Sequence, residues 1–124
     1  MRWFVVESHL RTMKTPFNHL NDMGWGNGYV IMSKEHPWHG VSYDNLNDIV
    51  YAHGGLTYSE TLTKEHTQSW LDLSPADIGK HMIGFDTSHF MDTFEKWPKS
   101  EVILETQALY RQVQSMGGKY KFLT

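Results

Sequence analysis

The chain contains no cysteine, which excludes disulfide bonds, a thiolate zinc site and a cysteine nucleophile. It also has no block of basic residues, and its formal net charge is −3 with the histidines neutral. Proteins that bind duplex nucleic acid need a cationic surface, so we expect no such partner. The apolar runs are far shorter than a membrane-spanning helix, and residues 3–6 are too short for a secretory signal. We therefore expect a cytoplasmic protein with no membrane partner.

The sequence is rich in histidine and in aromatic side chains. Its 124 residues include eight histidines, and 14% of the residues are aromatic within an apolar fraction of 40%. This length and composition predict one domain, residues 1–124, with a sizeable core. Because histidine titrates near neutral pH and binds metals, its abundance directs attention to acid/base or metal chemistry, although several of the eight are expected to be ordinary surface residues.

Hydrophobic patterning predicts an α+β fold, a small mainly antiparallel sheet with a long C-terminal helix packed on one face. Strands are expected at residues 3–6, 29–32, 45–53 and 82–85, with a further edge strand at 119–123. The helix is expected from Pro98 to about Met116, where Gly117 and Gly118 would end it. Residues 59–80 are the most polar stretch and are expected to form a peripheral insertion, in which residues 74–77 start a one-turn helix.

The apolar residues between the last strand and the C-terminal helix also follow a helical spacing. Phe90, Phe94 and Trp97 lie at positions i, i+4 and i+7. A stripe of this kind on a helix packs into a core more often than it contacts a cofactor. We therefore expect these three side chains to be buried.

Two expected strands end in residues that can carry chemistry. One strand ends at His53, before two glycines, and the other ends at Asp86, which His89 and Asp92 follow at a spacing of three. If the strands are neighbours, these four side chains converge as candidate catalytic residues: His53, Asp86, His89 and Asp92. The same four would be candidate ligands for a divalent ion, Mn, Zn or Mg, or would form a metal-free acid/base group. A plainer interpretation is that Asp86 caps the next turn and the other side chains face solvent.

Further side chains could bind a ligand around this group. The loop at residues 33–44 carries ionisable and aromatic residues together, as binding rims do. The glycines after His53 could offer backbone N–H groups to an anion. The candidate ligand-binding residues are Tyr29, His36, His39, Tyr43, Asp44, Gly54, Gly55 and Thr57.

Several short segments occur in the same order as in a family of small proteins of bacteriophages and prophages, which this sequence resembles. The segments are Gly28-Tyr29-Val30, His36-Pro37, Gly40, Tyr43-Asp44, residues 53–58 (HGGLTY), Gly84-Phe85-Asp86 and residues 89–92. The resemblance covers about residues 26–115, and HGGLTY with GFDxxHxxD is its most specific part. Asn45 stands where the family carries a second acid. The resemblance implies a phage origin, and hence a location in the host cytoplasm. It also implies that the residues at the motif positions bind a ligand rather than pack in the core.

Two classes of function remain open from the sequence. The first is a small hydrolase, metal- or His/Asp-assisted, that acts on a phosphate ester or nucleotide, such as a host defence signal. The second is a non-catalytic binder that sequesters a nucleotide signal or inhibits a host protein, with Tyr29, Trp38 and Tyr43 stacking on a base. The carboxylates favour the enzyme, because they would repel an anionic ligand unless a cation or proton offsets them. The sequence leaves the oligomeric state open.

Overall fold

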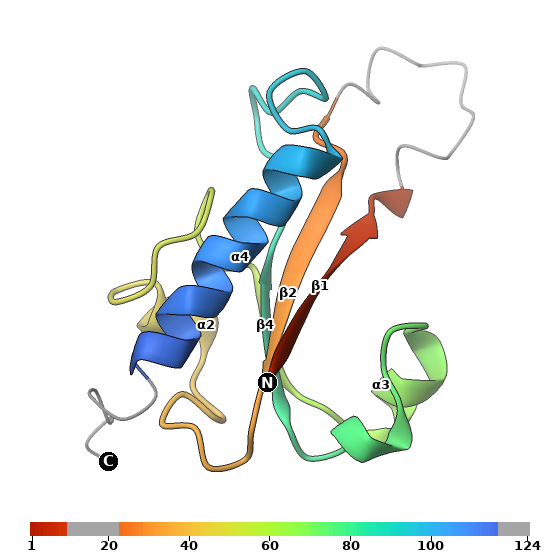
Figure 1. Ribbon diagram of the computed structural model, residues 1–124, viewed down its shortest axis with the longest axis vertical. Coiled ribbons are helices and arrows are strands. Elements are labelled where there is room, and N and C mark those ends of the chain that lie inside the picture. The colour runs from red at the N-terminus through yellow and green to blue at the C-terminus, as the bar shows by residue number, and fades with distance from the viewer. Residues whose placement is uncertain (10–22, 117–124) are drawn as a thin grey trace.

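The computed structural model describes residues 1–9 and 23–116 (Figure 1). A four-stranded antiparallel sheet has the order β1-β2-β4-β3. Its strands are β1 (Arg2–Glu7), β2 (Gly26–Met32), β3 (Tyr58–Thr61) and β4 (His81–Phe85). The helices are α2 (Tyr43–Leu46), α3 (Lys64–Ser69), the one-turn 3₁₀ helix η2 (Pro75–Asp77) and α4 (Lys99–Met116). The predicted α+β class is confirmed, as is the long helix that begins just after Pro98.

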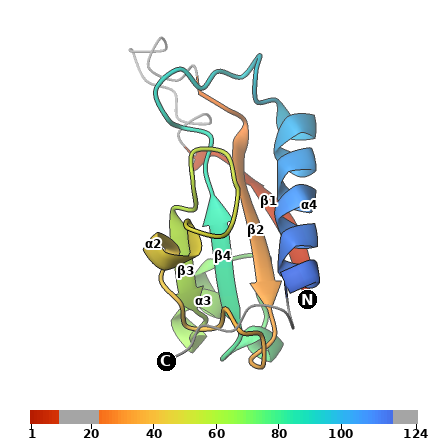
Figure 2. The same ribbon diagram turned by 90° about the vertical axis from the view of Figure 1, so that its left-hand side faces the viewer.

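The two faces of the sheet have separate cores, because side chains alternate along each strand. On one face, Val30 and Ile83 pack against α4, which lies over β1 and β2, and against Trp38 from the loop after β2 (Figure 2). On the other face, Tyr29 and Met82 form a second cluster with residues that include Leu62, Leu73 and Trp70. None of the helices in the described ranges has the length and apolar character needed to span a bilayer.

The segment expected to be a peripheral insertion, residues 59–80, belongs to the sheet and to the second core. It supplies most of the edge strand β3, and η2 confirms the expected one-turn helix. Asp77, only 1% exposed, accepts two hydrogen bonds from the Arg2 guanidinium, at 2.6 and 2.9 Å. These bonds from Arg2 hold the pKa of Asp77 down at about 2. The segment is thereby tied to β1, the strand at the far edge of the sheet.

The strand predicted at residues 45–53 is wrong, because this stretch contains α2 followed by turns. Val50 and Ala52 are buried, while Tyr51 between them is 76% exposed, so burial alternates here as it does along a strand. The backbone hydrogen bonds, however, differ from those of a strand. Gln112 on α4 accepts the Tyr51 N–H at 2.9 Å and donates to the Tyr51 carbonyl at 2.7 Å. One side chain therefore replaces the neighbouring strand.

The other differences concern the ends of elements. β2 begins at Gly26, three residues before the predicted start, so the glycine-rich stretch forms part of the strand. The expected helix stop at Gly117-Gly118 and the expected strand at residues 119–123 lie outside the described residues.

Gly28 sets how closely α4 approaches the sheet. A Cβ at this position of β2 would overlap the Thr106 hydroxyl on α4 and the Phe85 ring on β4. Both Thr106 and Phe85 are buried, so neither has room to move aside.

We expect Gly28→Ala to lower the free energy of unfolding by about 2 kcal/mol, within the usual range for overpacking a core. Gly40→Ala is the control, because nothing lies within 4 Å of a Cβ there and only the positive φ of 79° is disturbed. Urea denaturation of both variants measures the difference. Equal losses would contradict the close packing of α4 on Gly28.

Candidate functional site

β4 stops and α4 begins at the same end of the sheet (Figure 1). The structure brings the four predicted catalytic residues together there. His53 comes from the loop between α2 and β3. Asp86, His89 and Asp92 come from the loop between β4 and α4, residues 86–98. The two loops meet at a hydrogen bond between His53 Nε2 and Asp92 Oδ1, 2.8 Å long.

Asp92 lies at the centre of the site and is only 7% exposed. Its Oδ1 accepts from His53 Nε2, and its Oδ2 accepts the backbone N–H of His89 at 3.0 Å. The Asp92 N–H in turn donates to the His89 carbonyl, also at 3.0 Å. Both carboxylate oxygens are thus engaged, and the side chain has a single well-defined position.

His53 is held on three sides. Its ring stacks on Trp97, with centroids 4.1 Å apart and planes at 37°, and its backbone N–H donates to Glu105 Oε1 at 3.0 Å. Because the neutral ring must donate from Nε2 to the Asp92 carboxylate, Nδ1 carries the lone pair. No described residue forms a hydrogen bond with Nδ1. This is the arrangement of an oriented general base.

A second pair lies beside the first. His89 Nε2 is 3.1 Å from Asp86 Oδ1, and the ring of His89 stands nearly perpendicular to that of His53, with centroids 5.8 Å apart. Nε2 is solvent-inaccessible, yet its angle to Asp86 is not that of a hydrogen bond. Asp86 Oδ1 instead accepts the N–H and hydroxyl of Ser88, both at 3.2 Å.

Gly54 makes room for the second pair. It has a positive φ of 69°, and a Cβ at this position would overlap the imidazole of His89. The amide of Gly55 is already used, because it donates to the Ala52 carbonyl at 2.8 Å. The glycines of this segment therefore serve the turn and the approach of His89, and the Gly55 amide is not available for an anion.

Within residues 1–9 and 23–116, no group of three or more His, Asp or Glu side chains is positioned to hold a metal ion. The four site residues form two His–Asp pairs, His53 with Asp92 and His89 with Asp86. In this arrangement they are suited to proton transfer.

His36 and His39 do not lie at the rim of this site. His36 Nε2 donates to the Val113 carbonyl at 2.9 Å and its Nδ1 accepts the Trp38 N–H at 3.0 Å, while His39 Nε2 donates to the Gly79 carbonyl at 2.8 Å. Val113 is eight residues after Glu105 on α4, about 12 Å along the helix. Burial lowers the pKa of His36. Both rings are thus engaged in holding the loop after β2.

The other predicted ligand-binding residues are also dispersed. Tyr29 is buried in the second core, where its ring stacks on Phe4, and its hydroxyl accepts from Asn27 at 3.3 Å. Trp38, expected to stack on a base, is fully buried in the first core. Exposed positions are occupied by Tyr43 and Asp44 on α2 and by Thr57 before β3.

The helical apolar stripe predicted at Phe90, Phe94 and Trp97 is wrong for the two phenylalanines, whereas Trp97 is partly buried and packs against the first core. Residues 86–98 are irregular, and Phe90 and Phe94 are exposed. The physical cause is Asp92, whose contacts with His53 and His89 turn the chain inward. Met91 has a φ of 76°, which ends any helical turn.

Sequence reasoning missed the side chains that hold the site. Trp97 was expected only as part of an apolar stripe, and Glu105 and Gln112 were not among the candidate site residues. Asn47 accepts the Leu56 N–H at 2.7 Å and donates to the Leu56 carbonyl at 3.2 Å, which closes the loop around His53. The one signal available was that Glu105 and Gln112 lie two turns apart on one face of the helix.

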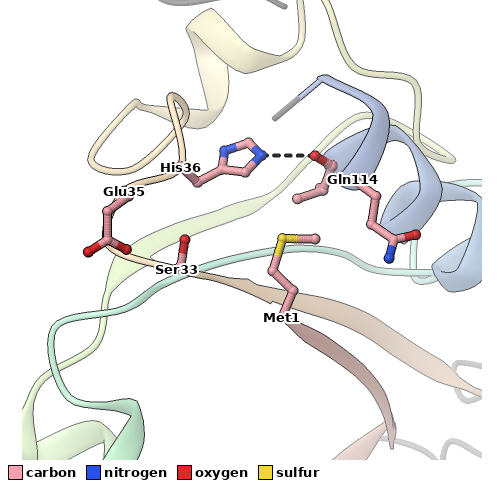
Figure 3. A pocket seen from close by; sticks show the side chains of 6 residues that line it. Met1, Ser33, Glu35, His36 and Gln114 are labelled. Carbon is pink, nitrogen blue, oxygen red and sulfur yellow. Dashed lines mark hydrogen bonds between the residues drawn. The ribbon is translucent and has the colours of Figure 1, made fainter. Parts of the chain in front are cut away.

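A separate cavity lies at the opposite end of the sheet, with a volume of about 480 Å³ (Figure 3). It is open to solvent, and His36 lies at its wall with its Nε2 donating to the Val113 carbonyl. The described side chains that line it are Met1, Ser33, Glu35, His36, Val113 and Gln114. The cavity shares none of the four site residues.

His81, at the start of β4, is a buried histidine that is only 2% exposed. Because the Ser59 hydroxyl donates to the Val41 carbonyl at 2.7 Å, His81 Nε2 must donate to that hydroxyl, also at 2.7 Å. Nδ1 then accepts from the Gly40 N–H at 3.3 Å and from Thr61. Burial, with smaller effects of the His39 and His36 charges, lowers the pKa of His81 to about 4.

Comparisons with known proteins add no parallel for this site. No protein-family model, curated protein or solved structure matches the chain. The assignment of function therefore depends on the geometry described above.

The buried His81 makes stability depend on pH. Between about pH 6.5 and pH 4 the unfolded chain binds a proton at this residue that the folded chain does not, so stability falls as the pH falls. We expect this residue to account for about 2 to 3 kcal/mol of lost stability between about pH 7.5 and 4.5. Urea denaturation at both pH values, for the unmodified chain and His81→Gln, measures it. A variant with an undiminished pH dependence would contradict the assignment.

Proposed function

We propose that this chain is a small His/Asp-assisted hydrolase that acts on a phosphate ester or nucleotide. The observation that carries the proposal is the His53–Asp92 hydrogen bond, 2.8 Å long, with a second imidazole 5.8 Å away between ring centroids. Two imidazoles at this separation can serve as base and acid on opposite sides of one reacting phosphorus atom. Removal of a proton from water and its return to a leaving oxygen are the two transfers that such hydrolysis needs.

His53 is the base in this mechanism. Its Nδ1 removes a proton from a water molecule as the water oxygen forms a bond to phosphorus. Asp92 keeps the proton of the neutral ring on Nε2 and stabilises the positive charge that develops. Trp97 stacks on the same ring and limits its rotation.

His89 is the acid. Its Nε2 is solvent-inaccessible and faces Asp86, so Nδ1 is the nitrogen directed to a substrate. As the bond from phosphorus to the leaving oxygen breaks, the protonated ring of His89 gives the Nδ1 proton to that oxygen and becomes neutral. The proton gained by His53 equals the proton lost by His89, and exchange through water restores both rings.

The contacts of the carboxylates are compatible with an anionic substrate. Asp92 is buried and uses both oxygens within the site, and Asp86 Oδ1 accepts from Ser88. The substrate would therefore meet imidazole edges and the partly exposed Asp86 rather than Asp92. The resemblance to phage proteins suggests a nucleotide defence signal in the host cytoplasm as one candidate substrate.

We expect His53→Gln to reduce kcat about 100-fold or more, because a general base contributes two to four orders of magnitude. Asp92→Asn should also reduce kcat. KM should change little in both variants. The same substitution at a histidine of α3, His66→Gln, is the matched control. The measurement is steady-state hydrolysis of bis-p-nitrophenyl phosphate, p-nitrophenyl phosphate and a set of nucleoside phosphates, with circular dichroism to confirm folding. Unchanged turnover in a folded His53→Gln variant would refute the role of His53.

The participation of a metal ion is a separate question with its own test. If the two His–Asp pairs transfer protons as proposed, EDTA should leave kcat within about twofold and added Mn, Zn or Mg should not raise it. Loss of activity with EDTA and its recovery with one of these ions would support the metal-assisted hydrolase instead, with the same four residues as ligands.

A non-catalytic binder is the second candidate, and one observation favours it. Phe90 and Met91 are exposed apolar residues directly beside the site. A binder would show no turnover, and His53→Gln would then reduce ligand affinity together with function. In the enzyme, affinity persists while turnover falls.

A further inference from the structure

The site carries an unusual turn on its surface. The Asp92 N–H donates to the His89 carbonyl at 3.0 Å, which closes a four-residue turn with Phe90 and Met91 at its centre. Phe90 is 94% exposed and Met91 is 64% exposed. A lone exposed apolar residue is common on protein surfaces and carries no argument by itself.

The backbone of this turn adds a second observation. Met91 has a φ of 76°, and among the described residues it is the non-glycine residue with a positive φ. A turn with a positive φ at its third residue favours glycine, because a Cβ there is crowded by the backbone. Strain of this kind persists where the surrounding structure fixes it and is concentrated at functional sites. Here the fixed points are the two ends of the turn, His89 and Asp92.

The strain has a definite structural effect. With Asp92 directed inward to His53, the left-handed residue before it leaves Phe90 projecting into solvent. Phe90 directly follows His89, so their Cα atoms are about 3.8 Å apart. An exposed planar apolar side chain therefore lies one residue from a histidine of the site.

We propose that Phe90 is a stacking platform for a nucleobase, so that the substrate of the site is a nucleotide rather than a simple phosphate ester. This inference rests on the proposed function and narrows it. Every base has a flat π-face that stacks on an aromatic side chain, and such contacts tolerate changes of base. The phosphate would lie across the edges of the His53 and His89 rings while the base covers Phe90.

The test separates binding from catalysis. In the His53→Gln background, where turnover is expected to be lost, the probe is 2-aminopurine riboside 5′-monophosphate, whose fluorescence is quenched on stacking. We expect saturable quenching by the full chain and a Kd at least about fivefold weaker with Phe90→Leu. Phe90→Trp should restore the affinity. Leu71→Ala, at a fully exposed residue between α3 and η2, is the control and should leave the Kd unchanged.

The outcomes distinguish this inference from the proposed function. Probe binding that is equal in the Phe90→Leu and unmodified chains would overturn the platform. Hydrolysis of p-nitrophenyl esters without binding of the nucleotide probe would also overturn it and leave the hydrolase standing. If Phe90→Leu abolishes the pull-down of a host protein and the probe does not bind, the turn is a protein-docking element and the inference is wrong.

Discussion

The buried carboxylate of Asp92 is the interaction on which the site depends. It joins two loops that are far apart in sequence, because one oxygen accepts from His53 and the other from the His89 backbone. A buried carboxylate with one free oxygen would be costly, so satisfying both oxygens also restricts the conformations of both loops. The strained φ of Met91 and the exposure of Phe90 follow from the inward direction of this one side chain. Chemistry and local geometry are therefore coupled at a single residue.

The loop that carries His53 has no strand partner, and polar side chains replace one. Gln112 pairs with both backbone groups of Tyr51, Glu105 accepts the His53 N–H, and Asn47 pairs with both backbone groups of Leu56. Two of these three residues come from α4, which is itself packed on the sheet. The irregular backbone around His53 is thus anchored by hydrogen bonds to α4, the longest of the described helices. A rigid scaffold of this kind is what a precisely placed base requires.

The histidines separate into two chemical roles according to burial. His36 and His81 use both ring nitrogens in hydrogen bonds within the protein, and burial lowers their pKa values. His53 donates to the Asp92 carboxylate, His89 lies beside the Asp86 carboxylate without a hydrogen bond, and neither Nδ1 forms a hydrogen bond with a described residue. The number of histidines in the sequence does not distinguish these roles. They are distinguished by the number of ring nitrogens that remain available to a ligand.

The sequence by itself determined the class of fold, the last strand of the sheet and the long helix after Pro98, because hydrophobic period and helix signals are local properties. It also placed His53, Asp86, His89 and Asp92 in one candidate group, although only Asp86 directly follows a strand and the strand expected to end at His53 is not formed. Tertiary structure alone decided that residues 45–53 form no strand, because the partner that satisfies Tyr51 is Gln112, sixty-one residues away. It likewise decided that Phe90 is exposed while Trp97 supports His53. Those outcomes depend on contacts between distant residues, about which the spacing of apolar residues carries no information.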